Sequence, residues 1–540
     1  MAVDAGKSLL KQEVPMMREW INKYKHLFLP IALLGVLLFF FSYICFLNLS
    51  LTPSFYCTDM YSDVLYAVRA WESKSIFPEG WVFGNQFYVI ATPVLSALIY
   101  GITGHPALSM AIASILMTLG IACSLLWMLK PVFLRFEERL VVLLSLVVLT
   151  AYCGNAVYAL NGWQLFFTMC SYYACYLITA FLCFGCFLRR QEALTKPRMV
   201  MLAVALLLSF GAGMQSLRQT AIMLPPMLAL EAFTQIKSLV KQRRLQWQPL
   251  AITAALSVAN VMGLLVIRIL NIPQHEIFSS ATLLGREEIP ASVNTTLQHV
   301  TTLLTSYENF GVLLITVVLI AVLAHFQSKW QNEEQTLPHW GALVALFGFS
   351  VLGIAVLDIF TKMSVRSIYY FMLLPLLALL PAYVYRRWRF GKPIVLALLA
   401  VFAITSFQNN VLPSVKQAEN AQENVSYEIS EMLVEKGYTT IYSGWNQCED
   451  VAIASGGKLT AGFWDRSKED VFKPVKYLCD PSVYEVESDK CVYYLRRDNL
   501  ELALRVARVR GVTMTLVAEY PEWGIFLYEA SENLMVTSNE

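Results

Sequence analysis

Residues 50–87 have the sequence SLTPSFYCTDMYSDVLYAVRAWESKSIFPEGWVFGNQF and directly follow a long apolar run at 27–50. An apolar run of about 20 residues is long enough to cross a bilayer as a helix. Within the following segment, apolar residues recur at helical spacing, which predicts a short amphipathic helix over 61–73 at the outer membrane surface. Thr58 or Ser62 could cap the start of this helix. A membrane span followed by a surface helix is therefore the first predicted unit.

The composition excludes an ordinary soluble protein. Of the 540 residues, 57% are hydrophobic and 15% are charged, and the mean hydropathy is +0.53. Soluble domains carry about 25% charged residues. The sequence thus predicts a polytopic α-helical membrane protein with about 11 to 12 spans. We expect these spans at 27–50, 106–129, 140–157, 165–188, 199–214, 219–235, 249–271, 307–326, 339–357, 367–384 and 393–410, with a weaker twelfth candidate at 85–104.

The distribution of basic residues predicts the orientation in the membrane. Cytoplasmic loops collect Lys and Arg, and such clusters lie in 1–26, 189–198, 237–244 and 386–392. All of them can be cytoplasmic only if the interrupted segment 85–104 does not cross completely. We therefore expect eleven full crossings, a cytoplasmic N-terminus, and a re-entrant or surface-lying segment between the first two strong spans.

A change in charge density marks a second domain. Residues 411–540 hold 13 Lys+Arg and 21 Asp+Glu, so 34 of 130 residues are charged, against 46 of 410 in residues 1–410. Alternating strand-like and helix-like segments predict an α/β domain there. The expected division is a cytoplasmic segment 1–26, a membrane domain 27–410 with its first outer loop at 51–84, and an extracytoplasmic α/β domain at the C-terminus. Neither part has the basic stripe of a nucleic-acid binder.

The first outer loop carries two acidic residues four positions apart, Asp59 and Asp63. They lie on one helix face if the helix begins early enough. One interpretation is a solvated first-turn charge that favours the helix dipole. The other is a general base for an acceptor hydroxyl, or a carboxylate pair that binds a divalent metal through oxygen ligands. No cofactor is required by the sequence, and a divalent metal remains one alternative.

Four basic residues on the predicted outer side run against the positive-inside tendency: Arg218, Arg286, Lys362 and Arg366. Such side chains suit a phosphate or pyrophosphate group. The alternative is a set of structural ion pairs, such as Arg286 with a neighbouring glutamate and Lys362 with Asp358.

The cysteines show no zinc-binding spacing. Several lie in predicted spans, where Cys behaves as a small apolar residue. Outside the spans, a disulfide between Cys479 and Cys491 is compatible with an oxidising compartment.

Three stretches carry a resemblance to a known family: TDMYSDVLYAVRAWESKSIFPEGWVFGNQ (58–86), GITGHPALSMAIASILM (101–117) and GYTTIYSGWNQCEDVAIASGGKL (437–459). With the predicted topology, they resemble the GT-C glycosyltransferases, in particular uncharacterised bacterial members. The resemblance implies a plasma-membrane enzyme that takes a sugar from a polyprenyl-phosphate carrier. It also implies a catalytic base in the first outer loop, which maps onto Asp59 or Asp63.

The next outer loop, ALNGWQ (159–164), lacks the second acidic residue that some GT-C relatives carry, and this argues against a metal site shared by two loops. The resemblance implies a polyprenyl-phosphate-linked sugar, membrane lipids and a glycan, lipid or cell-wall acceptor as partners, and no nucleic acid. Three rival functions are a transporter or flippase for lipid-linked glycans, a polymerase or ligase of lipid-linked glycans, and a non-catalytic envelope protein whose outer domain binds a partner. Ion-coupled transport is disfavoured because the span centres are nearly free of charge.

Overall fold

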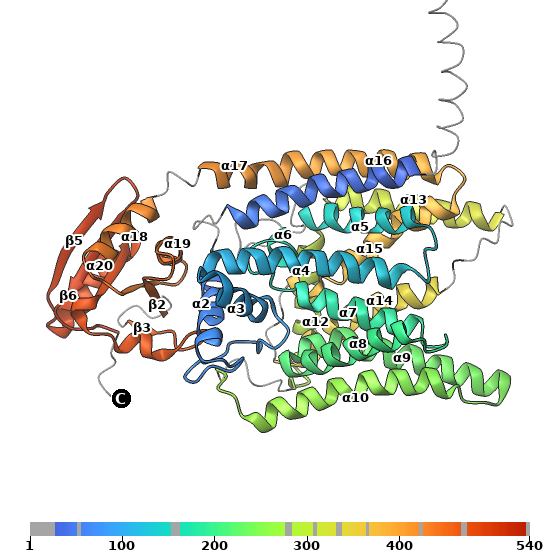
Figure 1. Cartoon of the computed structure of the whole chain (residues 1–540), viewed down its shortest axis with the longest axis horizontal. Coiled ribbons are helices and arrows are strands. Elements are labelled where there is room, and N and C mark those ends of the chain that lie inside the picture. The colour runs from blue at the N-terminus through green and yellow to red at the C-terminus, as the bar shows by residue number, and fades with distance from the viewer. Residues whose placement is uncertain are drawn as a thin grey trace, which may run out of the picture.

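The computed structural model describes residues 27–50, 56–152, 162–275, 283–305, 310–330, 337, 339–362, 365, 367–420, 425–465 and 472–535. The predicted cytoplasmic segment 1–26 lies outside these residues. The described chain forms a long helical bundle and a smaller domain built on a sheet, which lies at one end of the bundle (Figure 1).

The helices of the bundle lie where hydropathy predicts spans. Over the described residues, seven helical stretches are long and apolar enough to cross a membrane. The protein is thus a multi-pass membrane protein. The helices at the eleven predicted spans are Leu27–Leu49, α4 (Pro106–Leu129), α5 (Phe136–Ala151), α7 (Ala174–Leu188), α8 (Lys196–Gln215), α9 (Leu217–Gln242), α10 (Trp247–Leu270), α13 (Phe310–Trp330), α14 (Trp340–Phe360), α15 (Leu373–Arg387) and α16 (Gly391–Ser406).

The interrupted segment at 85–104 forms only a short helix, α3 (Thr92–Thr103). Its 12 residues span roughly 18 Å at 1.5 Å per residue, which is less than the hydrocarbon thickness of a bilayer. The helix ends at Gly104 in the left-handed conformation, and α4 follows almost at once. This agrees with the expectation of a segment that does not cross completely.

The span predicted at 165–188 is divided, in contrast to the expectation. A short helix α6 (Trp163–Phe166) and α7 are separated by buried irregular backbone. Asn48 satisfies part of this backbone, since its side-chain amide donates to the Phe167 carbonyl and accepts from the Met169 amide. Non-helical backbone in a membrane domain is tolerated where the protein itself provides such partners.

Small residues bring two helices of the bundle together. A Cβ on Gly213 of α8 would lie 2.0 Å from the Asn260 carbonyl of α10, and a Cβ on Gly263 of α10 would lie 2.0 Å from the Phe210 carbonyl. The Asn260 amide also donates to the Ser209 carbonyl at 2.9 Å. Close backbone approach at small residues is a common way to pack helices in membranes.

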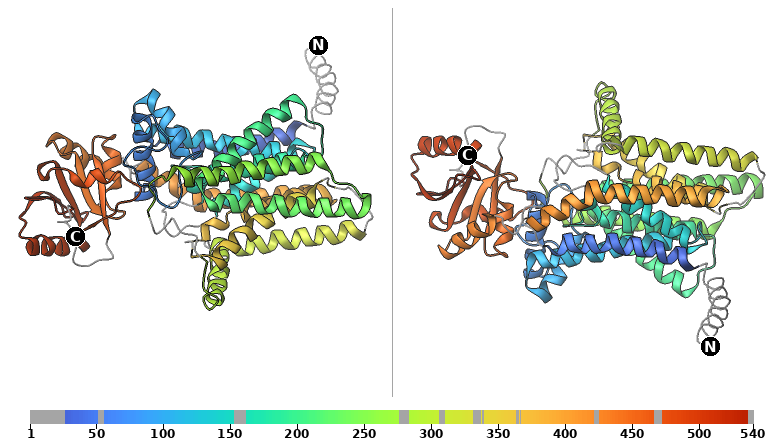
Figure 2. Two further views of the ribbon diagram at one scale, coloured as in Figure 1. Left: turned by 90° about the horizontal axis from the view of Figure 1, so that it is seen from below. Right: turned by 90° about the horizontal axis from the view of Figure 1, so that it is seen from above.

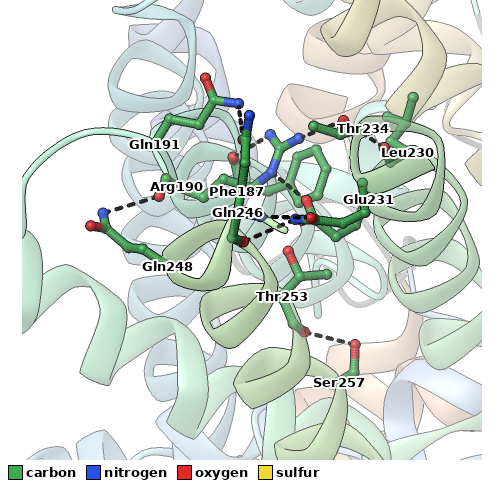
Figure 3. A network of polar contacts seen from close by, with 11 residues as sticks. Phe187, Arg190, Gln191, Leu230, Glu231, Thr234, Gln246, Gln248, Thr253 and Ser257 are labelled. Atoms are coloured by element: carbon green, nitrogen blue, oxygen red, sulfur yellow. Dashed lines mark hydrogen bonds and ion pairs between the residues drawn. The ribbon is translucent and has the colours of Figure 1, made fainter. Parts of the chain in front are cut away.

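A buried polar network joins α7, α9 and α10 at the bundle end far from the C-terminal domain (Figures 1 and 3). Arg190 pairs with Glu231 at 2.6 Å, and both side chains are almost fully buried. The Gln235 amide donates to Glu231 and to the carbonyl of Gln246. A second pair, between the partly exposed Arg386 and the buried Glu138, links α15 to α5 at 3.1 Å. These ion pairs involve residues at or close to predicted cytoplasmic clusters.

One helix of the outer segments runs across the bundle. Helix α12 (Ile289–Thr305) lies roughly perpendicular to the bundle helices at the end near the C-terminal domain, as the yellow-green helix of Figure 2 shows. It contacts α14 and the 3₁₀ turn η2 (Ser367–Tyr370). The Ser292 hydroxyl donates to the Asp358 carbonyl at 2.7 Å, which fixes α12 on the end of α14.

The C-terminal domain is a mixed α/β unit, as the sequence predicts. Its six-stranded sheet has the order β3-β2-β1-β4-β6-β5, in which β1 is parallel to β2 and β4 and the remaining pairs are antiparallel. The central strand β1 is buried at every position, as expected for a strand covered on both faces. The elements are β1 (Thr440–Gly444), β2 (Thr460–Asp465), β3 (Lys473–Pro474), β4 (Cys491–Arg496), β5 (Met514–Tyr520), β6 (Ile525–Ala530), α18 (Val425–Glu435), α19 (Glu449–Ala454), α20 (Arg497–Arg510), η5 (Pro481–Glu485) and η6 (Ser488–Lys490).

The junction between the two parts is helical. Helix α16 continues through a π-helical turn, η3 (Phe407–Val411), into α17 (Leu412–Asn420). The chain therefore remains helical beyond residue 410, and the α/β unit itself begins with α18.

The Cys479–Cys491 disulfide expectation is wrong. Both residues are buried free thiols. The Cys479 thiol donates to the Val475 carbonyl and the Cys491 thiol to the Ser488 carbonyl, so each is used within its own local turn.

Candidate functional site

Helix α2 (Thr58–Glu72) carries both candidate carboxylates. It starts earlier than the predicted 61–73, so Asp59 lies in its first turn and Asp63 one turn later on the same face. Neither Thr58 nor Ser62 caps it: the N-cap residue is Cys57, without a side-chain hydrogen bond. The capping expectation is therefore wrong, and the Thr58 hydroxyl has other partners, described below.

Asp63 is buried between α2 and the membrane domain. Its side chain is 1% exposed, and its Oδ1 has no hydrogen-bond partner. The Tyr88 hydroxyl donates a hydrogen bond to the carboxyl group. Burial raises the pKa of the Asp63 carboxyl well above its usual range, and the nearby Asp59 charge adds to the rise. A buried, incompletely satisfied carboxyl with a perturbed pKa is typical of a functional site.

Asp59 has a different environment. It is half-buried rather than sealed, and it lies next to Thr58 at the very start of α2. A carboxylate that is partly accessible can reach the hydroxyl of an incoming molecule, which a sealed carboxyl cannot do without rearrangement.

The face of α2 opposite to Asp59 and Asp63 lies against the C-terminal domain. Tyr61, Val64 and Val68 line a cavity of about 140 Å³, together with Gly456 and Gly457 of the C-terminal domain. The predicted surface helix is thus covered on its apolar face by protein.

The loop after α2 links the aspartates to Arg218. Gln215, at the end of α8, accepts hydrogen bonds from the amides of Val89 and Ile90, directly after Tyr88. Arg218 follows three residues later, in the first turn of α9. Its Nη2 donates to the Asn85 carbonyl at 3.1 Å. One continuous loop, residues 82–91, therefore connects the two charged parts of the site.

Arg218 is a buried cation held among aromatic rings. It is 4% exposed, and its guanidinium lies 4.1 Å from the centre of the Tyr369 ring. Its Nε and Nη1 have no hydrogen-bond partner. Tyr173 packs edge-to-face on Tyr369, and Tyr176 donates to Gln86 of the loop. A buried guanidinium with unused donors is a ready site for an anion.

The structure does not group the other predicted basic residues with Arg218. Arg286 and Lys362 are exposed and lie on neighbouring segments joined by the Leu283–Thr361 bridge. Lys362 pairs with Glu288 at 3.9 Å. Arg366 lies outside the described residues.

The alternative ion pair between Lys362 and Asp358 is wrong. Asp358 accepts from the Tyr370 hydroxyl and lies 2.8 Å from His299 Nδ1, so its carboxyl is used to hold α12.

Sequence reasoning missed two residues of the C-terminal domain, Asn446 and Glu449, that bind Thr58 at the start of α2. The Thr58 hydroxyl donates to the carboxyl of Glu449, and Thr58 also exchanges hydrogen bonds with Asn446. Glu449 is 3% exposed, and burial raises its pKa to about 7. No spacing rule connects residues so far apart in the chain. The stretch 437–459 carried a family resemblance, but nothing in it marked Asn446 or Glu449 as partners of α2.

A metal centre is not assembled by the described residues: they contain no group of three or more His, Cys, Asp or Glu side chains that could hold a metal ion. Asp59 and Asp63 alone supply fewer protein oxygens than a calcium site takes, and one of the two is sealed. The two carboxylates thus do not form a complete calcium site by themselves.

Comparison with solved structures identifies the fold. The chain is similar to ArnT from Cupriavidus metallidurans in the apo state, with a TM-score of 0.55 and 11% identity over 94% of this chain and 99% of that chain. ArnT is a GT-C glycosyltransferase. The chain has the GT-C fold. The structure of the same ArnT bound to undecaprenyl phosphate matches with a TM-score of 0.51 and 13% identity over the same shares.

The GT-C fold confirms the architecture that the sequence resemblance implied. No protein-family model matches the sequence, and no match was found among curated proteins. Within this GT-C fold, the site contains a carboxylate pair on α2, the 82–91 loop, and a buried guanidinium at the start of α9.

Proposed function

We propose that the protein is a membrane glycosyltransferase that moves a sugar from a polyprenyl-phosphate donor to an extracytoplasmic glycan, lipid or cell-wall acceptor. The observation that carries this proposal is the GT-C fold shared over nearly the whole chain with ArnT, one structure of which holds undecaprenyl phosphate. The charged groups of the site supply what such a reaction needs, a base and an anion-binding cation.

The general base is assigned to Asp59, with Asp63 as its buried neighbour. The acceptor hydroxyl oxygen attacks the anomeric carbon of the donor sugar, and its proton passes to the carboxylate. The bond between that carbon and the phosphate oxygen breaks, and the lipid phosphate leaves with the electron pair. A single displacement of this kind inverts the anomeric configuration. Asp59 is preferred because it is half-buried, whereas Asp63 is 1% exposed.

Arg218 is the group proposed to hold the lipid phosphate. Two of its nitrogens are buried without a hydrogen-bond partner and can donate to phosphate oxygens as negative charge develops on the leaving group. Arg286 and Lys362, which are exposed, are proposed to attract the anionic headgroup through long-range attraction. Arg366 is proposed for the same role from its charge alone. No step of this scheme passes through a metal ion.

The proposed topology follows from the loop charges. The N-terminus is cytoplasmic, and the α/β domain lies outside a bacterial plasma membrane, on the side where the acceptor is found. Arg190 and Arg386 lie at the end of the bundle that this orientation places in the cytoplasm.

The proposal is tested in cells that lack the protein. Envelope glycans and lipids are compared by mass spectrometry after complementation with wild type, Asp59→Asn or Asp63→Asn. We expect wild type to restore a sugar modification, Asp59→Asn to abolish it, and Asp63→Asn to reduce it. Wild-type levels of product with both variants would exclude the mechanism, and a transport defect without any missing sugar would favour a flippase.

A further inference from the structure

The carboxyl end of strand β1 is the position where an open α/β sheet commonly binds a ligand. Strands β2 and β4 flank β1 on opposite sides and run parallel to it, so the strand order reverses at β1. Ligands of such sheets bind in the crevice outside the carboxyl ends at this point. Here two residues that follow β1, Asn446 and Glu449, instead contact the start of α2.

The contact is a closed set of hydrogen bonds between Thr58, Asn446 and Glu449. The backbone amide of Thr58 donates to the side-chain oxygen Oδ1 of Asn446 at 3.0 Å. In return, the backbone amide of Asn446 donates to the Thr58 hydroxyl oxygen at 2.9 Å. The same hydroxyl donates to Glu449. The Thr58 hydroxyl therefore uses its donor and one acceptor position. The first amides of a helix have no partner within the helix, and the Thr58 amide finds its partner in the C-terminal domain.

The backbone around this contact is adapted to it. Asn446 has a φ of 59°, in the left-handed region that few residues other than Gly and Asn adopt. One turn along α2, the Tyr61 hydroxyl accepts from the Ala461 amide of β2 at 2.8 Å. The residues on both sides of Asp59 are thus held by the C-terminal domain.

We infer that Asn446 and Glu449 are positioning residues, which act through Thr58 to set the place and direction of Asp59 at the start of α2. This inference rests on the proposed function, because it assigns the C-terminal domain a part in the transfer reaction. In this role the domain is called a clamp, because Asn446 and Glu449 hold the start of α2. They do so at the carboxyl end of β1, where a sheet of this kind commonly binds a ligand. A displacement of about 1 Å in such a group can cost roughly 100-fold in rate.

Hydrogen exchange measured by mass spectrometry on the purified full-length protein tests the clamp without any activity assay. Thr58→Val removes the hydroxyl while keeping the shape, and Thr58→Ser keeps the hydroxyl. We expect faster exchange of the 56–66 segment in Thr58→Val and Glu449→Ala, and wild-type exchange in Thr58→Ser. The matched control is Asp450→Asn, since this neighbouring half-buried acid accepts a hydrogen bond from Ser426 of α18. Unchanged exchange in Thr58→Val would overturn the clamp.

The catalytic consequence is tested in the complementation assay with the same variants. We expect product to fall by about 10- to 100-fold in Thr58→Val and to recover in Thr58→Ser, while binding of undecaprenyl phosphate, used as the probe, stays within about 2-fold of wild type. Wild-type product with altered exchange would overturn the positioning role. Wild-type product in Asp59→Asn would instead exclude the assigned base, and the exchange result would show separately whether the clamp exists.

Discussion

The Tyr61 hydroxyl on α2 accepts a 2.8 Å hydrogen bond from the backbone amide of Ala461 on β2, a residue 400 positions later in the chain. Tyr61 is 5% exposed, and its ring packs edge-to-face on Phe463 of the same strand. The first outer helix and the C-terminal domain are therefore one packed unit, although a whole membrane domain separates them in sequence.

Replacing Tyr61 by Phe should loosen this unit. The ring stays, but the buried Ala461 amide loses its partner, and an unsatisfied buried donor costs about 1 to 3 kcal/mol. We expect a lower Tm of the protein in detergent, measured by differential scanning calorimetry. Tyr100→Phe is the matched control, because Tyr100 lines the same cavity. Equal Tm values for the two variants would contradict the assigned bond.

The pH dependence of stability should report Glu449. Its pKa is raised to about 7 in the folded protein, above the ordinary value near 4.5. Between these values the folded state binds the extra proton, so stability falls as pH rises from about 4.5 to 7 and then levels. Asp63 and Asp450 have raised pKa values too and contribute in the same direction. The difference in Tm between wild type and Glu449→Gln should therefore change over this range, and a constant difference would refute the assignment.

Arg218 should control lipid-phosphate binding. Lysine keeps the charge but loses the planar fork of donors, so Arg218→Lys should weaken binding of undecaprenyl phosphate by about 10-fold, and Arg218→Met by more. Binding is measured by native mass spectrometry in detergent. The exposed Arg69, which pairs with Glu72 on α2, offers a control in Arg69→Gln. A similar loss in this control would indicate a general charge effect.

The buried pair of Arg190 and Glu231 should matter more when broken than when replaced as a whole. Glu231→Leu leaves an uncompensated buried guanidinium and should cost about 3 to 5 kcal/mol, whereas Arg190→Met with Glu231→Leu should cost clearly less. Thermal unfolding of the single and double variants measures this, and additive losses would contradict the coupling shown in Figure 3.

Chelation separates the two functional roles considered for the aspartate pair, a general base and a divalent-metal ligand. Because the described residues gather no group of three or more metal-binding side chains, we expect transfer to continue after extensive treatment with EDTA. Activity lost on chelation and restored by Mg²⁺ or Mn²⁺ would reinstate a metal held by Asp59, Asp63 and substrate oxygens.

Much of the fold could be predicted because it depends on local pattern. Apolar length located the helices, and the alternation of strand-like and helix-like segments identified the α/β unit. The prediction failed where a helix was interrupted by partners distant in sequence. The span at 165–188 is broken at buried backbone that Asn48 satisfies, and no local signal announces that contact.

The candidate site shows the same division. Asp59 and Asp63 were recognisable as acidic residues four apart beside a membrane span, and Arg218 as a cation on an unexpected side. Their environments were not recognisable, because they arise only from packing. Examples are the buried Oδ1 of Asp63 without a hydrogen-bond partner and the Tyr369 ring against the Arg218 guanidinium.

Sequence by itself determined the membrane class, the approximate helices and the identity of the charged groups, since hydrophobic length and charge are properties of neighbouring residues. Only the tertiary structure decided which groups meet. Thr58 and Asn446 are 388 residues apart, and their pairing depends on the path of the chain through the whole bundle. This contact between residues distant in sequence, and not any local motif, brings the C-terminal domain to the first turn of α2.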